Sequence, residues 1–166
     1  MKHNIVRINK IVLSNFKNVK KGIVEMPAYS GKELFSEKAD VLGLYGQNGS
    51  GKTSVVEALR FVKMLLSGEE LPADTKEYIA QGEEECEIDV SFSVAEEVQK
   101  ETVNYSVALK KDADGFVISH ERMTVVPRKE NVRAVESTLI DYQYDNEDVT
   151  FAPEYRYKKL VANDKK

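Results

Sequence analysis

The chain has 166 residues, of which 42% are hydrophobic and 31% charged, a size and balance that suit one folded domain and exclude a disordered chain. No apolar run approaches the ~18 residues of a membrane-spanning helix and the start of the chain is polar, so we expect a cytoplasmic protein without membrane contact. A net charge of −4 gives DNA binding no support without excluding it, and the single cysteine, Cys86, excludes internal disulfides.

Two antiparallel strands are predicted at the start of the chain. Residues 5–13 are rich in β-branched side chains with partial alternation, which favours a strand. Residues 14–18 are turn formers, and 22–26 have the pattern of a second strand. A polar loop at 27–37 then leads to 40–45, a short apolar run typical of a buried strand.

An amphipathic helix is predicted for residues 52–66, because apolar side chains recur there at spacings of three or four. This apolar face consists of Val55, Leu59, Val62 and Leu66. Gly68 follows the last of them, where a left-handed capping conformation would end the helix. The acidic stretch beyond it is expected to contain a short helix around 75–80.

An antiparallel β-meander is predicted for the second half of the chain. Three stretches alternate polar and apolar residues: 86–94, 102–110 and 116–126. A hairpin signal at 112–115 separates the last two of them. One more strand is predicted at 137–144, within a region, 127–166, that we expect to be less ordered.

The segment between the predicted buried strand and the helix matches the phosphate-binding pattern G-x-x-x-x-G-K-[ST]. Its residues are Gly46, Gln47, Asn48, Gly49, Ser50, Gly51, Lys52 and Thr53. Glycines let such a loop wrap around phosphate oxygens and aim N–H groups inward, and the helix N-terminus adds partial positive charge. We expect the Lys52 ammonium to reach the β- and γ-phosphates and the Thr53 hydroxyl to ligate Mg²⁺.

A glycine-rich turn that binds nothing is the alternative, and the order of strand, loop and helix favours phosphate binding over it. Guanine recognition requires a further set of contacts that the sequence does not show, which favours ATP over GTP without deciding between them. The predicted ligands are therefore ATP and Mg²⁺.

Two segments together resemble the amino-terminal half of ABC-type ATPase heads. Residues 11–18 give an Asn-Phe-basic turn after a strand, and 44–59 carry the GxNGxGKT loop followed by Ser54 and the helix. This group includes the RecF class, the structural-maintenance-of-chromosomes proteins and AAA-labelled ATPases of the overcoming-lysogenization-defect type. The likeness is good over 5–66 and looser over the meander. It implies an α/β P-loop NTPase fold, with 1–166 as a single nucleotide-binding domain that forms a partial lobe of such a head with an antiparallel β-meander.

The resemblance also implies roles for individual residues. In these families the turn after the first strand lies beside the adenine and ribose, a place that falls on Lys17, Asn18 and Val19 here. The alternative is that Phe16 packs in the core and the turn is a plain surface feature. Ser54 would join the loop in holding the nucleotide, and Lys52 would be the catalytic residue. Two heads would pair through the bound nucleotide.

Other motifs of such heads are missing or misplaced. In such heads a second buried strand ends in an aspartate that is followed by a glutamate. Asp141 follows only two apolar residues and is not followed by an acidic residue, so it does not match this pattern. Residues 66–70 resemble the LSGGQ-type signature loop of such heads, which must begin a helix far downstream. Here they end the predicted helix instead, so we interpret this resemblance as a coincidence. Gln143 is interpreted as a surface strand residue rather than as a Mg²⁺ sensor. We therefore expect the first portion of a longer ATPase, nearly inactive in isolation.

The predicted function is Mg-ATP binding as the amino-terminal part of an ABC-type ATPase in DNA repair, chromosome handling or phage defence. One alternative is a small P-loop phosphotransferase or kinase, which requires a mainly parallel sheet and a lid with arginines. The other is a non-catalytic interaction module with a vestigial loop.

Overall fold

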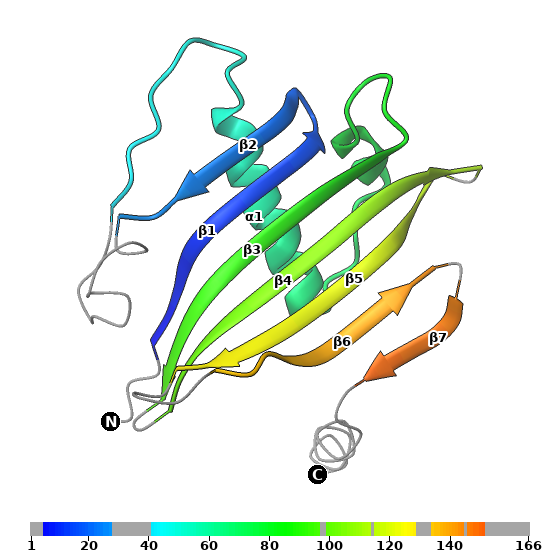
Figure 1. Ribbon diagram of the computed structural model, residues 1–166. Helices are drawn as coiled ribbons and strands as arrows, with labels where there is room; N and C mark the ends of the chain where they lie inside the picture. Colours follow the sequence, from blue (N-terminus) through cyan, green and yellow to red (C-terminus); the bar gives the residue numbers. More distant parts are fainter. Residues whose placement is uncertain are drawn as a thin grey trace.

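The structure is a computed structural model, which describes residues 5–27, 41–96, 99–113, 115–128, 134–144 and 146–151. The strands are β1 (Ile5–Phe16), β2 (Val19–Glu25), β3 (Glu85–Glu96), β4 (Gln99–Asp112), β5 (Gly115–Pro127), β6 (Ser137–Gln143) and β7 (Asn146–Phe151). The helices are α1 (Lys52–Ser67) and the short 3-10 helix η1 (Ala73–Tyr78). The strands form one antiparallel sheet in the order β2-β1-β3-β4-β5-β6-β7, and α1 crosses one face of it (Figure 1).

The β1–β2 hairpin confirms the two antiparallel strands predicted at the start, with shifted bounds. Phe16 pairs with Val19, so the turn between the strands is only two residues long. Lys17, the first residue of this turn, has a left-handed φ of 54°, which lets the chain reverse within so short a turn. The predicted loop at 27–37 lies outside the described residues except for Pro27.

The predicted β-meander is also confirmed, and it forms the middle of the sheet as β3, β4 and β5. Asp112 pairs with Gly115 and closes the predicted hairpin. β6 corresponds to the strand predicted at 137–144, and β7 follows it without having been predicted. Both lie within 127–166, whose last residues, 152–166, are outside the described part of the chain.

The hydrophobic core lies between the sheet and α1. Because side chains alternate along a strand, each inner strand turns one apolar set toward the helix. Leu13, Ile88 and Val107 are neighbours across β1, β3 and β4 and are almost fully buried. Ala58 and Phe61 of α1 are completely buried in the same cluster. The small Ala58 side chain lets the helix approach the sheet closely.

η1 completes this core beside α1. The Tyr78 ring packs against both Phe16 and Phe61, with centroid distances of 5.2 and 5.5 Å. The buried Thr75 hydroxyl donates a hydrogen bond to the carbonyl of Pro72 at 2.6 Å, which satisfies a polar group in the core. The short helix predicted nearby is confirmed, although it begins and ends slightly earlier in the chain.

Helix α1 confirms the predicted helix and its glycine cap. Gly68 has a φ of 68°, and its N–H donates to the carbonyl of Leu65 at 3.1 Å. The predicted apolar face is wrong in part, since Leu66 is 48% exposed. The buried residues of α1 are Ser54, Ala58, Phe61, Val62 and Met64. The helix carries apolar side chains on more than one side, and periodicity alone does not decide which side meets the sheet.

The buried strand predicted at 40–45 is wrong for the residues that the structure describes. Residues 41–47 have no regular secondary structure, and Val41 and Tyr45 are 89% and 95% exposed. Figure 1 shows this segment, in cyan, passing outside the edge strand β2. A strand needs a neighbour for its N–H and C=O groups, and none of the described strands pairs with this segment.

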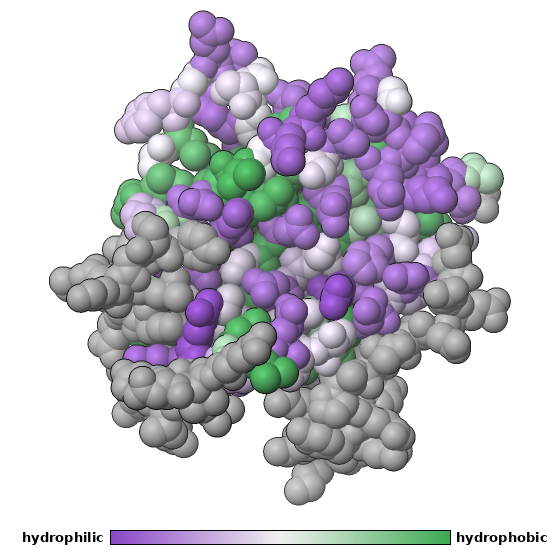
Figure 2. Space-filling view, viewed as in Figure 1, coloured by the Kyte–Doolittle hydropathy of each residue, from purple (hydrophilic) through white to green (hydrophobic). Residues whose placement is uncertain are grey.

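The face of the sheet away from α1 is predominantly hydrophilic (Figure 2). A hollow of about 300 Å³ on this face is lined by polar side chains that include Asp89, Asn104 and Arg122. Next to them the Thr124 hydroxyl donates a hydrogen bond to Glu136 Oε1 at 2.6 Å. The sheet therefore buries one face and presents the other to water, as antiparallel sheets commonly do.

Two titratable side chains lie within the core of the sheet. Cys86 of β3 is 2% exposed, and burial raises the pKa of its thiol to about 12. The Tyr105 hydroxyl donates to Glu121 Oε1 at 2.7 Å. Burial raises the pKa of Tyr105 far above its usual value, and the Glu121 carboxylate raises it further. Both groups therefore stay protonated at neutral pH.

We predict that Phe61→Ala destabilises the fold, because Phe61 is fully buried where α1, η1 and the sheet meet. The free energy of unfolding should fall by about 3–5 kcal/mol in urea-induced unfolding followed by circular dichroism. Val56→Ala on the same helix is the matched control, because Val56 is 64% exposed, and it should change the free energy of unfolding by less than about 0.5 kcal/mol. Equal effects of the two variants would contradict the assignment of the buried helix face.

Candidate functional site

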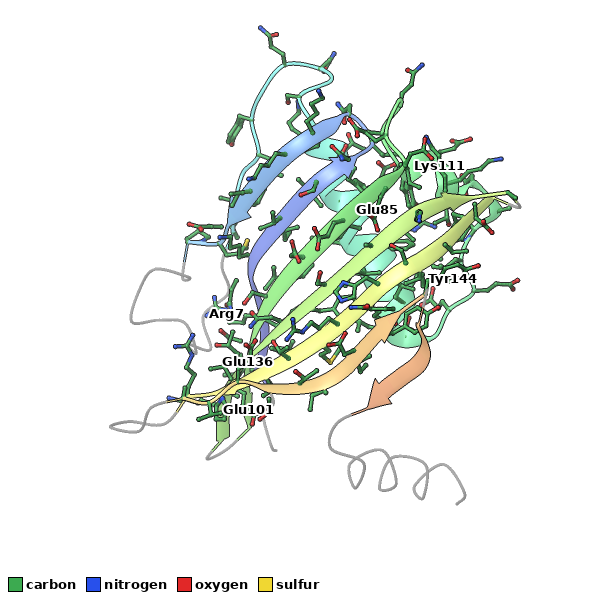
Figure 3. All side chains as sticks on the ribbon, turned by 45° about the vertical axis from the view of Figure 1, so that its right-hand side comes forward. Arg7, Glu85, Glu101, Lys111, Glu136 and Tyr144 are labelled. Atoms are coloured by element: carbon green, nitrogen blue, oxygen red, sulfur yellow. The ribbon has the colours of Figure 1, made fainter. Side chains whose placement is uncertain are left out.

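The loop at 46–51 lies where α1 begins, at the same end of the sheet as the β1–β2 turn (Figure 1). Glu85 and Lys111 mark this end of the sheet in Figure 3. Gly49 and Gly51 have left-handed φ values of 84° and 88°, and Gly51 is the N-cap of α1. Side chains with a Cβ rarely adopt this conformation, so the bend of the loop depends on glycine at both positions.

Lys52 closes the loop on itself. Its Nζ donates hydrogen bonds to the carbonyl oxygens of Gly46 and Gln47, both at 2.7 Å, and to Ser50 Oγ at 3.2 Å. The Ser50 N–H donates to the same Gln47 oxygen at 3.2 Å. An ammonium group and a main-chain amide thus converge on one oxygen atom of the loop. A phosphate oxygen requires donors of the same kind.

The N-terminus of α1 adds a second source of positive potential. In the described structure no side chain caps this end of the helix, and its first turn holds no acidic residue. The first amides of a helix have no partner within it, and together with the helix dipole they favour an anion. Thr53 is exposed on this turn, whereas Ser54 is 3% exposed. The end of the helix is therefore suited to a phosphate group.

Asn18 connects the β1–β2 turn to the loop. Its side-chain Nδ2 donates a hydrogen bond to the carbonyl of Gly49. Its Oδ1 accepts a hydrogen bond from Ser54 Oγ at 2.7 Å. The turn that the resemblance places beside a nucleotide thus touches both the loop and the first turn of α1.

Lys17 belongs to the same turn but lies against other partners. Its Nζ is 2.6 Å from Glu57 Oε1 of α1 and 5.2 Å from the centroid of the Tyr78 ring. Neither Glu57 nor Tyr78 was singled out from the sequence, because both are far from Lys17 along the chain. These contacts hold the Lys17 side chain beside the second turn of α1, next to the loop residues rather than among them.

Val19 packs directly against the loop. A Cβ added to Gly51 would lie 2.5 Å from Val19 Cγ2, far inside van der Waals contact. Gly51 is therefore required by the available space as well as by its φ. No sequence pattern marks this contact, because it joins the start of β2 to the start of α1.

An apolar hollow of about 260 Å³ opens beside the loop, between β2 and α1. Its walls include Val24, Val55 and Leu44, and Gly51 and Lys52 lie at its loop end. The segment that failed to form a strand supplies part of one wall. The candidate site therefore has a polar part in the loop and an apolar part next to it.

Asp141 is not part of this site. It lies in β6, four neighbour steps from β1 in the sheet, or about 19 Å at ~4.8 Å per step. Its Oδ1 is 3.7 Å from His120 Nε2, and its Oδ2 is 4.0 Å from Arg122 Nε. Gln143 lies on the same distant strand. The structure brings neither residue to the loop.

The stretch at 66–70 that resembles a signature loop lies at the far end of α1. Gly68 caps the helix there, and Ser67 Oγ donates to the carbonyl of Lys63 at 2.7 Å. From Lys52 to Gly68 the helix runs about 24 Å at ~1.5 Å per residue. The stretch thus serves to end the helix and does not reach the loop.

The described residues contain no group of three or more His, Cys, Asp or Glu side chains placed to hold a metal ion. Within the same part of the chain, no helix has the length and apolar character needed to cross a lipid bilayer.

Comparison with known families identifies a matching domain family. The family described as "AAA domain, putative AbiEii toxin, Type IV TA system" matches residues 41–160, well over half of the chain. The matched range contains the loop, α1 and the whole meander. No curated protein matches the chain.

We predict that Gly51→Ala is more destabilising than Gly49→Ala. Both residues have left-handed φ values, which cost alanine about 1–2 kcal/mol, but only at Gly51 would the new Cβ strike Val19. The free energy of unfolding in urea should show the larger loss for Gly51→Ala. In a double-mutant cycle Val19→Ala should remove the excess, and an additive result would contradict the clash.

Proposed function

Since the chain belongs to this AAA-domain family, we propose that it binds Mg-ATP through the loop from Gly46 to Thr53. AAA domains are P-loop nucleotide-binding domains of the ATPase type. The observation that carries the proposal is the convergence of the Lys52 ammonium and the Ser50 amide on one loop oxygen, the Gln47 carbonyl. To bind a phosphate, these donors would exchange the Gln47 oxygen for a phosphate oxygen, and Lys52 would also leave Gly46 and Ser50.

The residues of the loop have separate tasks in this proposal. The main-chain amides of the loop and of the first turn of α1 bind phosphate oxygens. Lys52 moves its ammonium from the Gly46 and Gln47 carbonyls to the β- and γ-phosphates, which makes it the catalytic residue of the chain. The exposed Thr53 hydroxyl binds Mg²⁺, which neutralises charge on the phosphates when bound.

The finer assignment is an ABC-type ATPase head, of which this chain would form the antiparallel lobe and the phosphate-binding loop. The antiparallel pairing of all the described strands supports this assignment over a small phosphotransferase or kinase, which requires a mainly parallel sheet. DNA repair, chromosome handling and phage defence remain the proposed settings. The family description adds a putative toxin of a type IV TA system to them.

The exposed segment at 41–45 supports the proposal that a further structural unit completes the head. Val41 and Tyr45 lie in the segment that leads into the loop, and both side chains are almost fully exposed. A neighbouring strand would cover them and satisfy their main-chain groups. Pairing of two heads through the nucleotide belongs to the same proposal, whereas contact with DNA has no support among the described residues.

We predict that Lys52→Ala lowers the affinity for Mg-ATP at least about tenfold in isothermal titration calorimetry, because it removes the ammonium that binds the phosphates. Lys63→Ala is the matched control. It removes the same charge from the same helix about 16 Å away and should change the affinity less than about twofold. An unchanged affinity of Lys52→Ala would support the vestigial-loop alternative instead.

We further predict slow ATP hydrolysis by the 166-residue chain. The structure pairs Glu57 with Lys17 and places Asp141 far from the loop, so neither carboxylate is positioned to activate water. A coupled phosphate-release assay should give a turnover well below ~1 per second. A turnover near that value, with Lys52→Ala inactive, would contradict the proposal that a further unit supplies the catalytic carboxylate.

A further inference from the structure

We propose that Asn18 is a positioning residue that fixes the phosphate-binding loop from outside, rather than a contact for the adenine or ribose. The inference rests on the proposed function of the loop, and it replaces the role that the family resemblance implies for Asn18. Its basis is the pair of hydrogen bonds that Asn18 makes to Gly49 and Ser54.

The turn that carries Asn18 is a rigid support. The N–H of Lys17 donates to the carbonyl of Tyr78 at 2.7 Å, and the N–H of Ala80 donates to the carbonyl of Asn15 at 2.8 Å. Main-chain hydrogen bonds thus tie the β1 side of the turn to the end of η1 and to the residues just after it. The Lys17–Glu57 ion pair ties it to α1 as well. A side chain anchored on this turn has a fixed position relative to the helix.

Both ends of the Asn18 amide are occupied by protein partners. Nδ2 donates to the Gly49 carbonyl, and Oδ1 accepts from the Ser54 hydroxyl. A carboxamide is suited to this task because it offers a donor and an acceptor side by side. These two bonds fix the orientation of the amide, which keeps one further N–H and one further lone pair.

The bond to Gly49 determines where the next amide points. In a trans peptide the C=O of Gly49 and the N–H of Ser50 lie in one plane and point in opposite directions. By holding the Gly49 carbonyl on the side of the β1–β2 turn, Asn18 aims the Ser50 N–H the other way, toward the Gln47 oxygen at 3.2 Å. That N–H is one of the two donors that converge in the loop. Asn18 therefore sets the direction of a phosphate-binding donor without touching phosphate.

Ser54 acts as the second anchor in this arrangement. Its side chain is 3% exposed, and its hydroxyl proton is directed to Asn18 Oδ1 at 2.7 Å. We therefore assign Ser54 to the support of Asn18 rather than to direct nucleotide binding. Loop, helix and turn are joined through this one carboxamide.

The test compares Mg-ATP with inorganic tripolyphosphate plus Mg²⁺ as ligands for the 166-residue chain and its Asn18→Ala variant. Because a misdirected amide weakens phosphate binding regardless of the base, both affinities should fall by the same factor, about five- to thirtyfold. Asn18→Asp should lose affinity similarly, since a carboxylate cannot donate to the Gly49 carbonyl. The matched control is Asn104→Ala on the hydrophilic face of the sheet, which should leave both affinities unchanged.

A fall in Mg-ATP affinity alone, with tripolyphosphate unaffected, would show Asn18 to be a base or ribose contact and would overturn the inference. Equal affinities of the wild-type chain and Asn18→Ala for both ligands would overturn it as well.

Amide hydrogen exchange of the unliganded protein tests the role of Asn18 independently of whether the loop binds a nucleotide. Asn18→Ala should speed exchange of the Ser50 amide about five- to thirtyfold, while the core amides of β3 remain protected. If the wild-type chain binds neither ligand, the proposed function fails, and this exchange experiment still decides whether Asn18 fixes the loop. Unchanged exchange at Ser50 would overturn the inference whatever the ligands do.

Discussion

The packing of α1 against the inner strands is the constraint on which the rest of the structure depends. Ala58 and Phe61 bury the helix against Leu13 and Ile88, and the short alanine side chain brings the two layers close together. This packing fixes the direction of the helix. Its N-terminus then lies at the end of the sheet where the β1–β2 turn reverses, so the turn can touch the loop that precedes the helix (Figure 1).

In the candidate site, the antiparallel sheet contacts the glycine-rich loop from the side, and no described strand leads directly into the loop. Asn18 and Val19 support the loop from the side, one by hydrogen bonds and the other by contact with Gly51. Lys52 and the Ser50 amide are left pointing at the Gln47 oxygen. The proposed phosphate donors are local in sequence, whereas Asn18, which bonds to the loop and to α1, comes from more than thirty positions away.

The segment at 41–45, before the loop, shows that forming a strand depends on a neighbouring strand as well as on the local sequence. Its apolar sequence suits a strand, yet Val41 and Tyr45 are exposed, because no strand among the described residues offers them hydrogen bonds. Family membership and the geometry of the loop agree on nucleotide binding. The exposure of this segment supports the proposal that a further unit covers it.

The sequence by itself determined the local features: the loop pattern, the helix and its Gly68 cap, the β1–β2 hairpin, and the meander. These follow from periodicity and turn chemistry within a few residues of chain. The tertiary structure alone decided which side of α1 is buried, that 41–45 stays unpaired, and that Asn18 bonds to Gly49 and Ser54. These outcomes depend on which surfaces meet in space, and short-range sequence patterns carry no information about such meetings.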